Sequence, residues 1–155
     1  MGVNSRVFPL GSIVLAIMAI TTPALAQREG INALIDDLLG DHLKYERVID
    51  ALKTAVVAHD AAGVAALVRY PIRVAVKGRK VRIASAAAFI ANYRDIVTPE
   101  IASAVTGTRY EDLFVRDQGV MFGSGQVWIG RVCRDAACGA FDAKVITIQS
   151  ASPAG

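Results

Sequence analysis

The sequence predicts an α+β protein in which N-terminal helices pack against a curved, mainly antiparallel sheet. Two observations support this fold class. Between residues 27 and 107, most apolar residues recur at the period of about 3.6 residues that is typical of helices burying one face. After Gly107 they fall in short runs separated by glycine-containing turns, as in an antiparallel meander. Helices followed by strands indicate two segregated layers.

Three helices are predicted before the first strand. A short helical segment covers residues 27–40, and Asp41 is placed to cap the main helix, because its side chain can accept from a free backbone N–H. Asp60 caps a shorter helix in the same way, and Pro71 ends that helix. The main helix carries an apolar stripe made of Leu43, Tyr45, Val48, Ile49, Leu52, Ala55 and Val56.

A β-hairpin is predicted over residues 71–85, where apolar residues alternate with polar ones. We expect Gly78 and Arg79 to form a two-residue turn of type II′, which needs glycine at its first position. This turn opposes Val74 to Ile83 and places the apolar set on one face, where a slip of one residue would break the match.

The other face of the hairpin carries the cations Arg73, Lys77, Lys80 and Arg82, with Lys77 expected opposite Lys80. One interpretation is a solvated outer face whose charges discourage edge pairing. The other is a basic patch for an anionic partner. No aromatic residues lie between the cations, which argues against a nucleic-acid partner.

Further helices and strands follow the hairpin. Ser85 is a suitable N-cap, and helical spacing continues to Val97, which predicts one continuous helix. Thr98 and Pro99 begin the next helix, which ends at Gly107. The predicted strands beyond it cover residues 113–115, 120–122, 126–132 and 141–149.

The first 26 residues have the features of a secretory signal peptide. Arg6 gives a weakly basic start, residues 7–20 are largely apolar, and the Ala-Leu-Ala sequence at 24–26 matches the small-x-small cleavage pattern. A retained membrane anchor is the alternative, but Pro9 and Gly11 interrupt the short apolar run. We therefore expect a periplasmic or secreted protein with no stable membrane insertion after cleavage.

The mature chain is expected to contain one α+β domain over residues 41–149 and a disordered tail over 150–155. Cleavage after residue 26 removes Arg6, the only charged residue of the leader, so the formal charge falls from +3 to +2. A charge so close to zero does not indicate a nucleic-acid binder.

The two cysteines, Cys133 and Cys138, are predicted to form a structural disulfide that closes a small loop in an oxidising compartment. Their spacing is not the C-x-x-C of a thioredoxin-like redox site. The only histidines, His42 and His59, have no ligand cluster near them in sequence, and no glycine-rich phosphate loop is present. We therefore expect neither a metal nor another cofactor.

No residue is predicted to be catalytic. The acid–base candidates are His59, Asp60, Tyr70, Tyr93, Asp95 and Tyr110, and none pairs with another in a motif. Tyr70, Phe89, Tyr93 and Trp128 are candidate pocket residues. Trp128 faces away from its strand neighbours, so it either fills the interior, which we favour, or is an exposed binding residue.

This order of elements, with Tyr70-Pro71 entering a hairpin and SAAAFIANYRDIVTP following it over residues 85–99, resembles the nuclear-transport-factor-2-like superfamily over residues 41–149. The resemblance implies a cystatin-like cone, in which a curved sheet wraps around helices and encloses a pocket. Some members of that superfamily are isomerases or dehydratases such as ketosteroid isomerase, and others are binding or dimerisation modules. The fold therefore does not choose between these functions.

The leading functional hypothesis is an exported, non-enzymatic binding or protein-interaction module. Its partner would be a small apolar ligand in the cone, an envelope protein on the sheet, or a second copy in a homodimer. An exposed apolar sheet face would favour docking, and a closed cone would favour a ligand. The alternatives are an acid–base lyase or isomerase acting on a small apolar ligand, and an immunity-type inhibitor of an envelope toxin that uses the basic hairpin.

Overall fold

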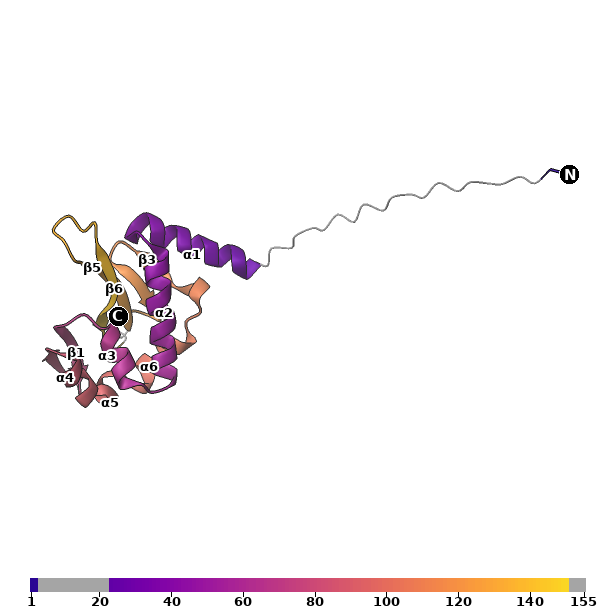
Figure 1. Cartoon of the computed structure of the whole chain (residues 1–155). Helices are drawn as coiled ribbons and strands as arrows, with labels where there is room; N and C mark the ends of the chain where they lie inside the picture. The colour runs from indigo at the N-terminus through magenta and orange to yellow at the C-terminus, as the bar shows by residue number, and fades with distance from the viewer. Residues whose placement is uncertain (3–22, 151–155) are drawn as a thin grey trace.

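The computed structural model describes residues 1–2 and 23–150, so the expectations for most of the leader and of the tail lie outside the described residues (Figure 1). Helices packed with antiparallel sheets confirm the predicted α+β class. The helices are α1 (Pro23–Leu39), α2 (His42–Val57), α3 (Ala61–Leu67), α4 (Ala86–Ala91), α5 (Tyr93–Ile96), α6 (Pro99–Gly107) and the 3-10 helix η1 (Tyr110–Asp112). The strands are β1 (Ile72–Val76), β2 (Arg79–Ile83), β3 (Phe114–Arg116), β4 (Gly119–Phe122), β5 (Val127–Cys133) and β6 (Phe141–Ile148).

The strands form two sheets. β3 to β6 make a four-stranded antiparallel meander, and β1 and β2 make a separate hairpin. The four strands predicted after Gly107 are all present, with their ends shifted by one residue at most. The chain entering the hairpin meets β6 at a parallel bridge between Val68 and Val145, where the Arg69 N–H donates to the Val145 carbonyl at 2.9 Å.

The inner face of the meander forms the core with α2. Val120, Ile129 and Val145 pair across β4, β5 and β6, and each has an exposed fraction of 0%. Directly paired residues of antiparallel strands share one face, so this row points towards the helices. The largest fully buried side chains around it include Tyr45, Phe89, Phe122, Ile35, Leu39 and Ile49.

The predicted N-caps are confirmed. The side chains of Asp41, Asp60, Ser85 and Thr98 each accept a hydrogen bond of 2.9 to 3.4 Å from a backbone N–H of the helix they precede. One member of the predicted apolar stripe of α2 is misplaced, because Leu43 is 55% exposed. It lies two positions before the buried residue at 45, and residues i and i+2 point to different sides of a helix.

The β1–β2 hairpin is present, but its predicted register and turn are wrong. Val74 pairs with Val81 rather than with Ile83, and the turn consists of Lys77 and Gly78, whose φ angles are +50° and +74°. Positive φ at both positions is the type I′ geometry, whose twist matches that of the strands. The two registers differ by two residues, so both keep the apolar residues on one face and alternation cannot distinguish them.

The helix predicted from Ser85 to Val97 is interrupted. α4 ends at Ala91, and Asn92 has φ −111° and ψ 11° before α5 begins. The Asn92 side-chain amide donates to the Ala88 carbonyl at 2.9 Å. Asparagine side chains compete with the backbone for such carbonyls, which is why they favour helix ends. The apolar spacing continues through the break and therefore did not reveal it.

The first helix is longer than predicted. α1 begins at Pro23, four residues before the expected segment, although its first turn is exposed. Ile35 and Leu39 are buried, and Arg28 forms an ion pair with Glu46 of α2. The segment is therefore part of the packed domain rather than a separate piece before residue 41. No helix in the described ranges is both long and apolar enough to cross a membrane.

The disulfide between Cys133 and Cys138 is present, with 4.8 Å between the two Cα atoms. It closes the loop between β5 and β6, which extends from the body of the molecule (Figure 1). Asp135 organises the same loop, since its carboxylate accepts the N–H groups of Gly139 and Ala140 at 3.0 and 2.6 Å. These hydrogen bonds lower the pKa of Asp135.

Candidate functional site

Three of the four candidate pocket residues form one aromatic cluster. The ring centroids of Tyr70 and Phe89 are 6.4 Å apart, and those of Phe89 and Tyr93 are also 6.4 Å apart. Phe89 has an exposed fraction of 0%, and the Tyr70 hydroxyl donates to the Ala65 carbonyl at 2.9 Å. These rings pack against one another beside α3 and α4, with Phe89 buried between the two tyrosines. The fourth residue, Trp128, is not part of the cluster.

Tyr93 also borders the surface, where it lines a hollow of about 490 Å³ together with His59 and Arg94. Its hydroxyl is buried and has no hydrogen-bond partner among the described residues. Burial, and then the negative charge of Asp60, raise the pKa of the Tyr93 phenol above its usual range. The group is therefore a neutral phenol at physiological pH.

The other acid–base candidates lie at the surface or in structural contacts. Asp60 caps α3, Asp95 lies 3.7 Å from the Lys77 amino group, and His59 is exposed at the end of α2. His42 pairs with a carboxylate of α1. In the described part of the chain no histidine or carboxylate is buried, so none lies in the low-polarity setting that strongly shifts a catalytic pKa.

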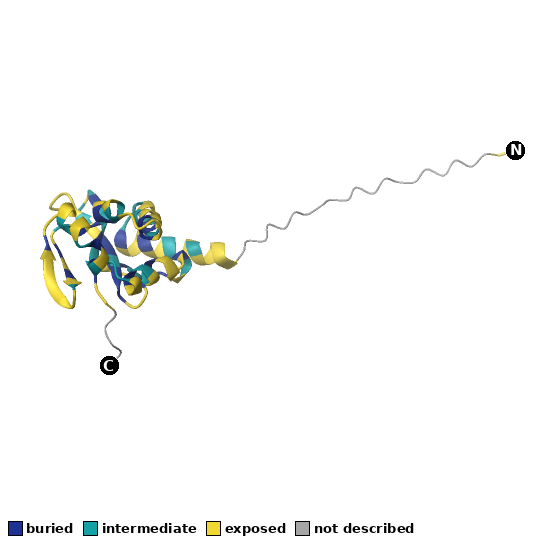
Figure 2. Cartoon of the chain, turned by 90° about the horizontal axis from the view of Figure 1, so that it is seen from below, coloured by how far each residue is buried: buried dark blue, intermediate teal, exposed yellow. Residues whose placement is uncertain are grey.

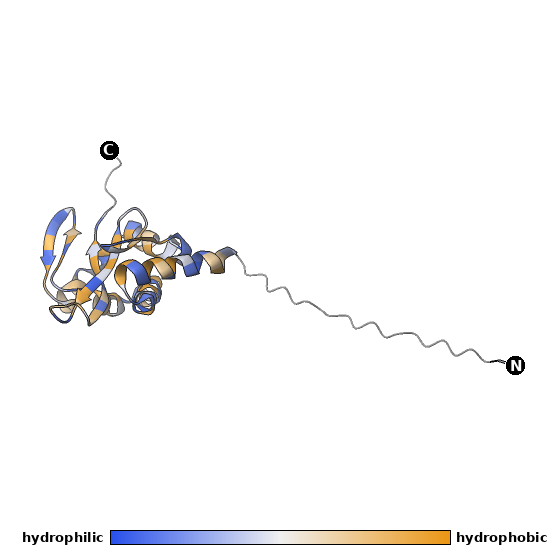
Figure 3. Ribbon diagram, turned by 90° about the horizontal axis from the view of Figure 1, so that it is seen from above, coloured by the Kyte–Doolittle hydropathy of each residue, from blue (hydrophilic) through white to orange (hydrophobic). Residues whose placement is uncertain are grey.

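The basic face of the hairpin contains three of its four predicted cations. Arg73 pairs directly with Arg82, and Lys80 lies on the same face of β2. All three are exposed, and most of β2 is exposed and hydrophilic (Figures 2 and 3). Lys77 lies instead in the turn, beside Asp95, so the expected opposition of Lys77 to Lys80 is wrong. Arg73 and Arg82 carry the same charge, so they repel each other mildly and neither neutralises the other.

The outer face of the meander carries a second, uncharged row. Phe114 pairs with Met121, Met121 with Trp128, and Trp128 with Thr147, so these four side chains cross all four strands on one face. We call them the outer row. Phe114 is 51% exposed, and the other three are half-buried. The outer row is uncharged and partly apolar, which would favour docking, and Arg116 of β3 and Lys144 of β6 flank it on the same face.

Trp128 belongs to this row, so the favoured prediction that it fills the interior is wrong. It lines a shallow hollow of about 590 Å³ on the outer face, together with Gln118, Ile146, Thr147 and Gln149. Its strand neighbours, Val127 and Ile129, point into the core. On the inner face, Val120, Ile129 and Val145 already pack in the core with α2.

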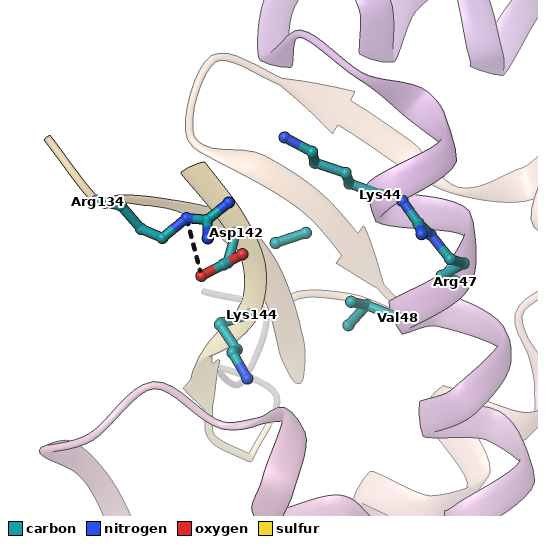
Figure 4. A pocket seen from close by; sticks show the side chains of 7 residues that line it. Lys44, Arg47, Val48, Arg134, Asp142 and Lys144 are labelled. Carbon is teal, nitrogen blue, oxygen red and sulfur yellow. Dashed lines mark ion pairs between the residues drawn. The ribbon is translucent and has the colours of Figure 1, made fainter. Parts of the chain in front are cut away.

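A third surface, which the sequence did not reveal, lies between α2 and β6 (Figure 4). Its hollow measures about 430 Å³. Side chains of α2 lie on one side, and those of β6 and the start of the disulfide loop lie on the other. We call this hollow the basic pocket; its lining residues are Lys44, Arg47, Val48, Arg134, Asp142, Ala143 and Lys144.

The sequence alone predicts only part of the outer row and part of the basic pocket. The outer row follows from alternation once the meander register is known, but register depends on turn geometry. In the basic pocket, Lys44 and Arg47 are neighbours on a helix face, and Asp142 and Lys144 are neighbours on a strand face. No local pattern brings α2 to β6, although Lys44 contacts the Phe141 carbonyl across 97 positions of the chain.

Comparison with known proteins adds no further identification, because no protein-family model, curated protein or solved structure matches this chain. Within the described ranges, no group of three or more histidine, cysteine, aspartate or glutamate side chains is arranged to hold a metal ion.

Proposed function

We propose that this chain is a non-enzymatic interaction module that forms a homodimer through the outer row of its four-stranded sheet. The observation that carries the proposal is an uncharged row of side chains across four strands, with Phe114 half exposed at the edge strand. Contiguous apolar surface of this kind is the usual mark of a protein–protein contact.

Charge favours a second copy as the occupant of this surface. In a symmetric dimer each residue of the contact meets the same patch of the partner, so a patch of one charge sign repels itself. The exposed hairpin face and the basic pocket are both rich in cations, whereas the outer row contains Phe114, Met121, Trp128 and Thr147 and no charge. Of these three surfaces, it is the one on which two identical copies can meet through uncharged side chains, with the cations Arg116 and Lys144 at its margin.

Sedimentation velocity over a wide range of protein concentration tests the proposal. The mature chain should sediment as a dimer, and Phe114→Ser should shift it to monomer. Leu43→Ser is a matched control, because Leu43 is similarly exposed at 55% but lies on α2. The chain contains a single tryptophan, so the fluorescence emission of Trp128 should move to shorter wavelength as the dimer forms. A monomer at every concentration, or equal dissociation by both variants, would overturn the proposal.

The proposal also includes membership of the nuclear-transport-factor-2-like superfamily and export to the periplasm or outside the cell. The order of helices, hairpin, helices and four-stranded meander supports the superfamily assignment. Export is supported by the Cys133–Cys138 pair, since such bridges persist in oxidising compartments.

The contacts of α1 are compatible with cleavage after residue 26. Residues 23–27 are exposed, and the packed residues of the helix, such as Arg28, Ile35 and Leu39, all follow the cleavage point. Expression of the full chain in a bacterium, followed by fractionation and intact-mass measurement, tests this part. A periplasmic product beginning at Gln27 is expected, and an uncleaved cytoplasmic product would contradict it.

A further inference from the structure

The basic pocket holds an excess of positive charge that the fold does not neutralise. Four cations line it and Asp142 is its only carboxylate, which leaves a formal charge of +3. Asp142 is already paired with Arg134 at 3.6 Å. Among the described residues, Lys44, Arg47 and Lys144 form no ion pair with any carboxylate. Like charges gathered in this way repel one another unless an anion joins them.

The cations are held in position and keep donors to spare. The Lys44 amino group donates to the Phe141 carbonyl at 3.2 Å and lies 4.1 Å from the centre of the Phe141 ring. The Lys144 amino group donates to the Ala66 carbonyl at 2.9 Å. Each ammonium has three donors, so two remain on each. Arg47 uses only Nε, which donates to the Leu43 carbonyl at 3.1 Å, and its two terminal nitrogens have no partner in the described chain.

A backbone donor lies at the same place. In an antiparallel pair, alternate residues direct both backbone groups away from the neighbouring strand. On β6, the Phe141 carbonyl receives Lys44 and the Val145 carbonyl receives the Arg69 N–H, so both point away from β5. Ala143, midway between them, therefore directs its N–H to the free edge, and Ala143 lines the basic pocket.

A purely structural explanation covers only part of this arrangement. A lysine at a free strand edge discourages pairing with another chain, which accounts for Lys44 on the Phe141 carbonyl. It does not account for Arg47, which lies on α2 beside Lys44, or for Arg134 beside Asp142.

We propose that the basic pocket binds a phosphomonoester group, with Arg47 and Lys44 as charged donors and the Ala143 N–H as a backbone donor. Lys144, whose ammonium points away from these two towards the Ala66 carbonyl (Figure 4), adds positive charge at the margin of the site. A phosphomonoester carries close to two negative charges and three acceptor oxygens, which suits several cations better than a single carboxylate does. Val48 and Ala143 provide an apolar wall for the carbon part of the ligand. The basic pocket and the outer row share no residue, so either proposal can fail without the other.

Two probes separate the sources of such a group. Inorganic phosphate is titrated into the 15N-labelled protein, and the amide shift of Ala143 is followed. Phosphatidylcholine vesicles with and without phosphatidic acid are tested in parallel by co-sedimentation. Saturable binding of phosphate indicates a small phosphorylated ligand, and binding only to the phosphatidic acid vesicles indicates a lipid headgroup. Saturation of neither probe would overturn the proposal.

A pair of charge-matched variants locates the binding. Arg47→Gln with Lys144→Gln should weaken binding at least tenfold, and glutamine at 144 can still donate to the Ala66 carbonyl. Lys80→Gln with Arg82→Gln removes the same charge from the exposed hairpin face and should leave affinity unchanged. Equal weakening by both pairs would show a general effect of charge and overturn the proposal. Thermal unfolding of each variant verifies that it is folded.

Discussion

The Tyr110 hydroxyl donates a hydrogen bond of 2.6 Å to the side-chain oxygen of Asn32, which joins η1 to α1 across 78 positions of the chain. The guanidinium of Arg28 lies 4.1 Å from the centre of the same tyrosine ring and pairs with Glu46 of α2. One phenol thus ties the first helix to the rest of the domain.

Removal of this hydroxyl should loosen α1. We expect Tyr110→Phe to lower the free energy of unfolding by about 1 kcal/mol, the usual contribution of one hydrogen bond. Amide hydrogen exchange should accelerate in α1 more than in β5. Tyr93→Phe is the matched control, because the Tyr93 hydroxyl has no partner among the described residues, and it should cost little. Unchanged exchange in α1 would contradict the role given to Tyr110.

The raised pKa of Tyr110 predicts that the protein loses stability at alkaline pH. Burial, followed by the negative charge of Glu46, raises the pKa of Tyr110 to about 12. The folded pKa lies above the unfolded value of about 10, so this contribution to stability is complete below pH about 10 and is lost as pH rises towards about 12. Unfolding midpoints in urea across this window should fall for the wild type and fall less for Tyr110→Phe. Parallel curves for the two proteins would contradict the assignment.

The loop closed by the disulfide should depend on Asp135 as well as on the bridge. The N–H groups of Ala140 and Gly139 hold the pKa of Asp135 below its usual value, so its contribution is present at neutral pH and lost as pH falls below about 4. We expect Asp135→Ala to accelerate amide exchange at Ala140 at neutral pH, and the wild type to show this only in acid. Asp117→Ala, at another exposed turn, is the control and should change nothing at Ala140.

The observed hairpin turn predicts a stabilising substitution. Lys77 has a φ of +50°, a conformation that costs most side chains energy but that asparagine tolerates. Lys77→Asn should therefore raise the free energy of unfolding by roughly 0.5 kcal/mol. Arg79→Asn is the matched comparison: it would help if Gly78 and Arg79 formed the turn, and it should not help in the observed register. Urea unfolding of the two variants distinguishes the registers.

Features that depend on neighbours in the chain could be predicted from the sequence. Asp41, Asp60, Ser85 and Thr98 cap helices because a short polar side chain reaches a backbone N–H only two or three residues ahead. Glycine-containing turns marked the boundaries of the four meander strands. The predicted strand ends differ from the observed ones by at most one residue. Cys133 and Cys138 lie close enough in sequence to meet within one loop.

The choices between equivalent local patterns depended on the tertiary structure. A hairpin register shifted by two residues satisfies the same alternation, and the side on which Trp128 lies depends on which face of the sheet α2 covers. The basic pocket exists only because α2 packs beside β6, which brings Lys44 against Phe141. By itself, the sequence determined the α+β class, the order of elements and the caps, since these are set by local hydrogen bonding and by hydrophobic period. Tertiary packing decided which faces remain open for binding, because burial of one face is a property of the whole chain.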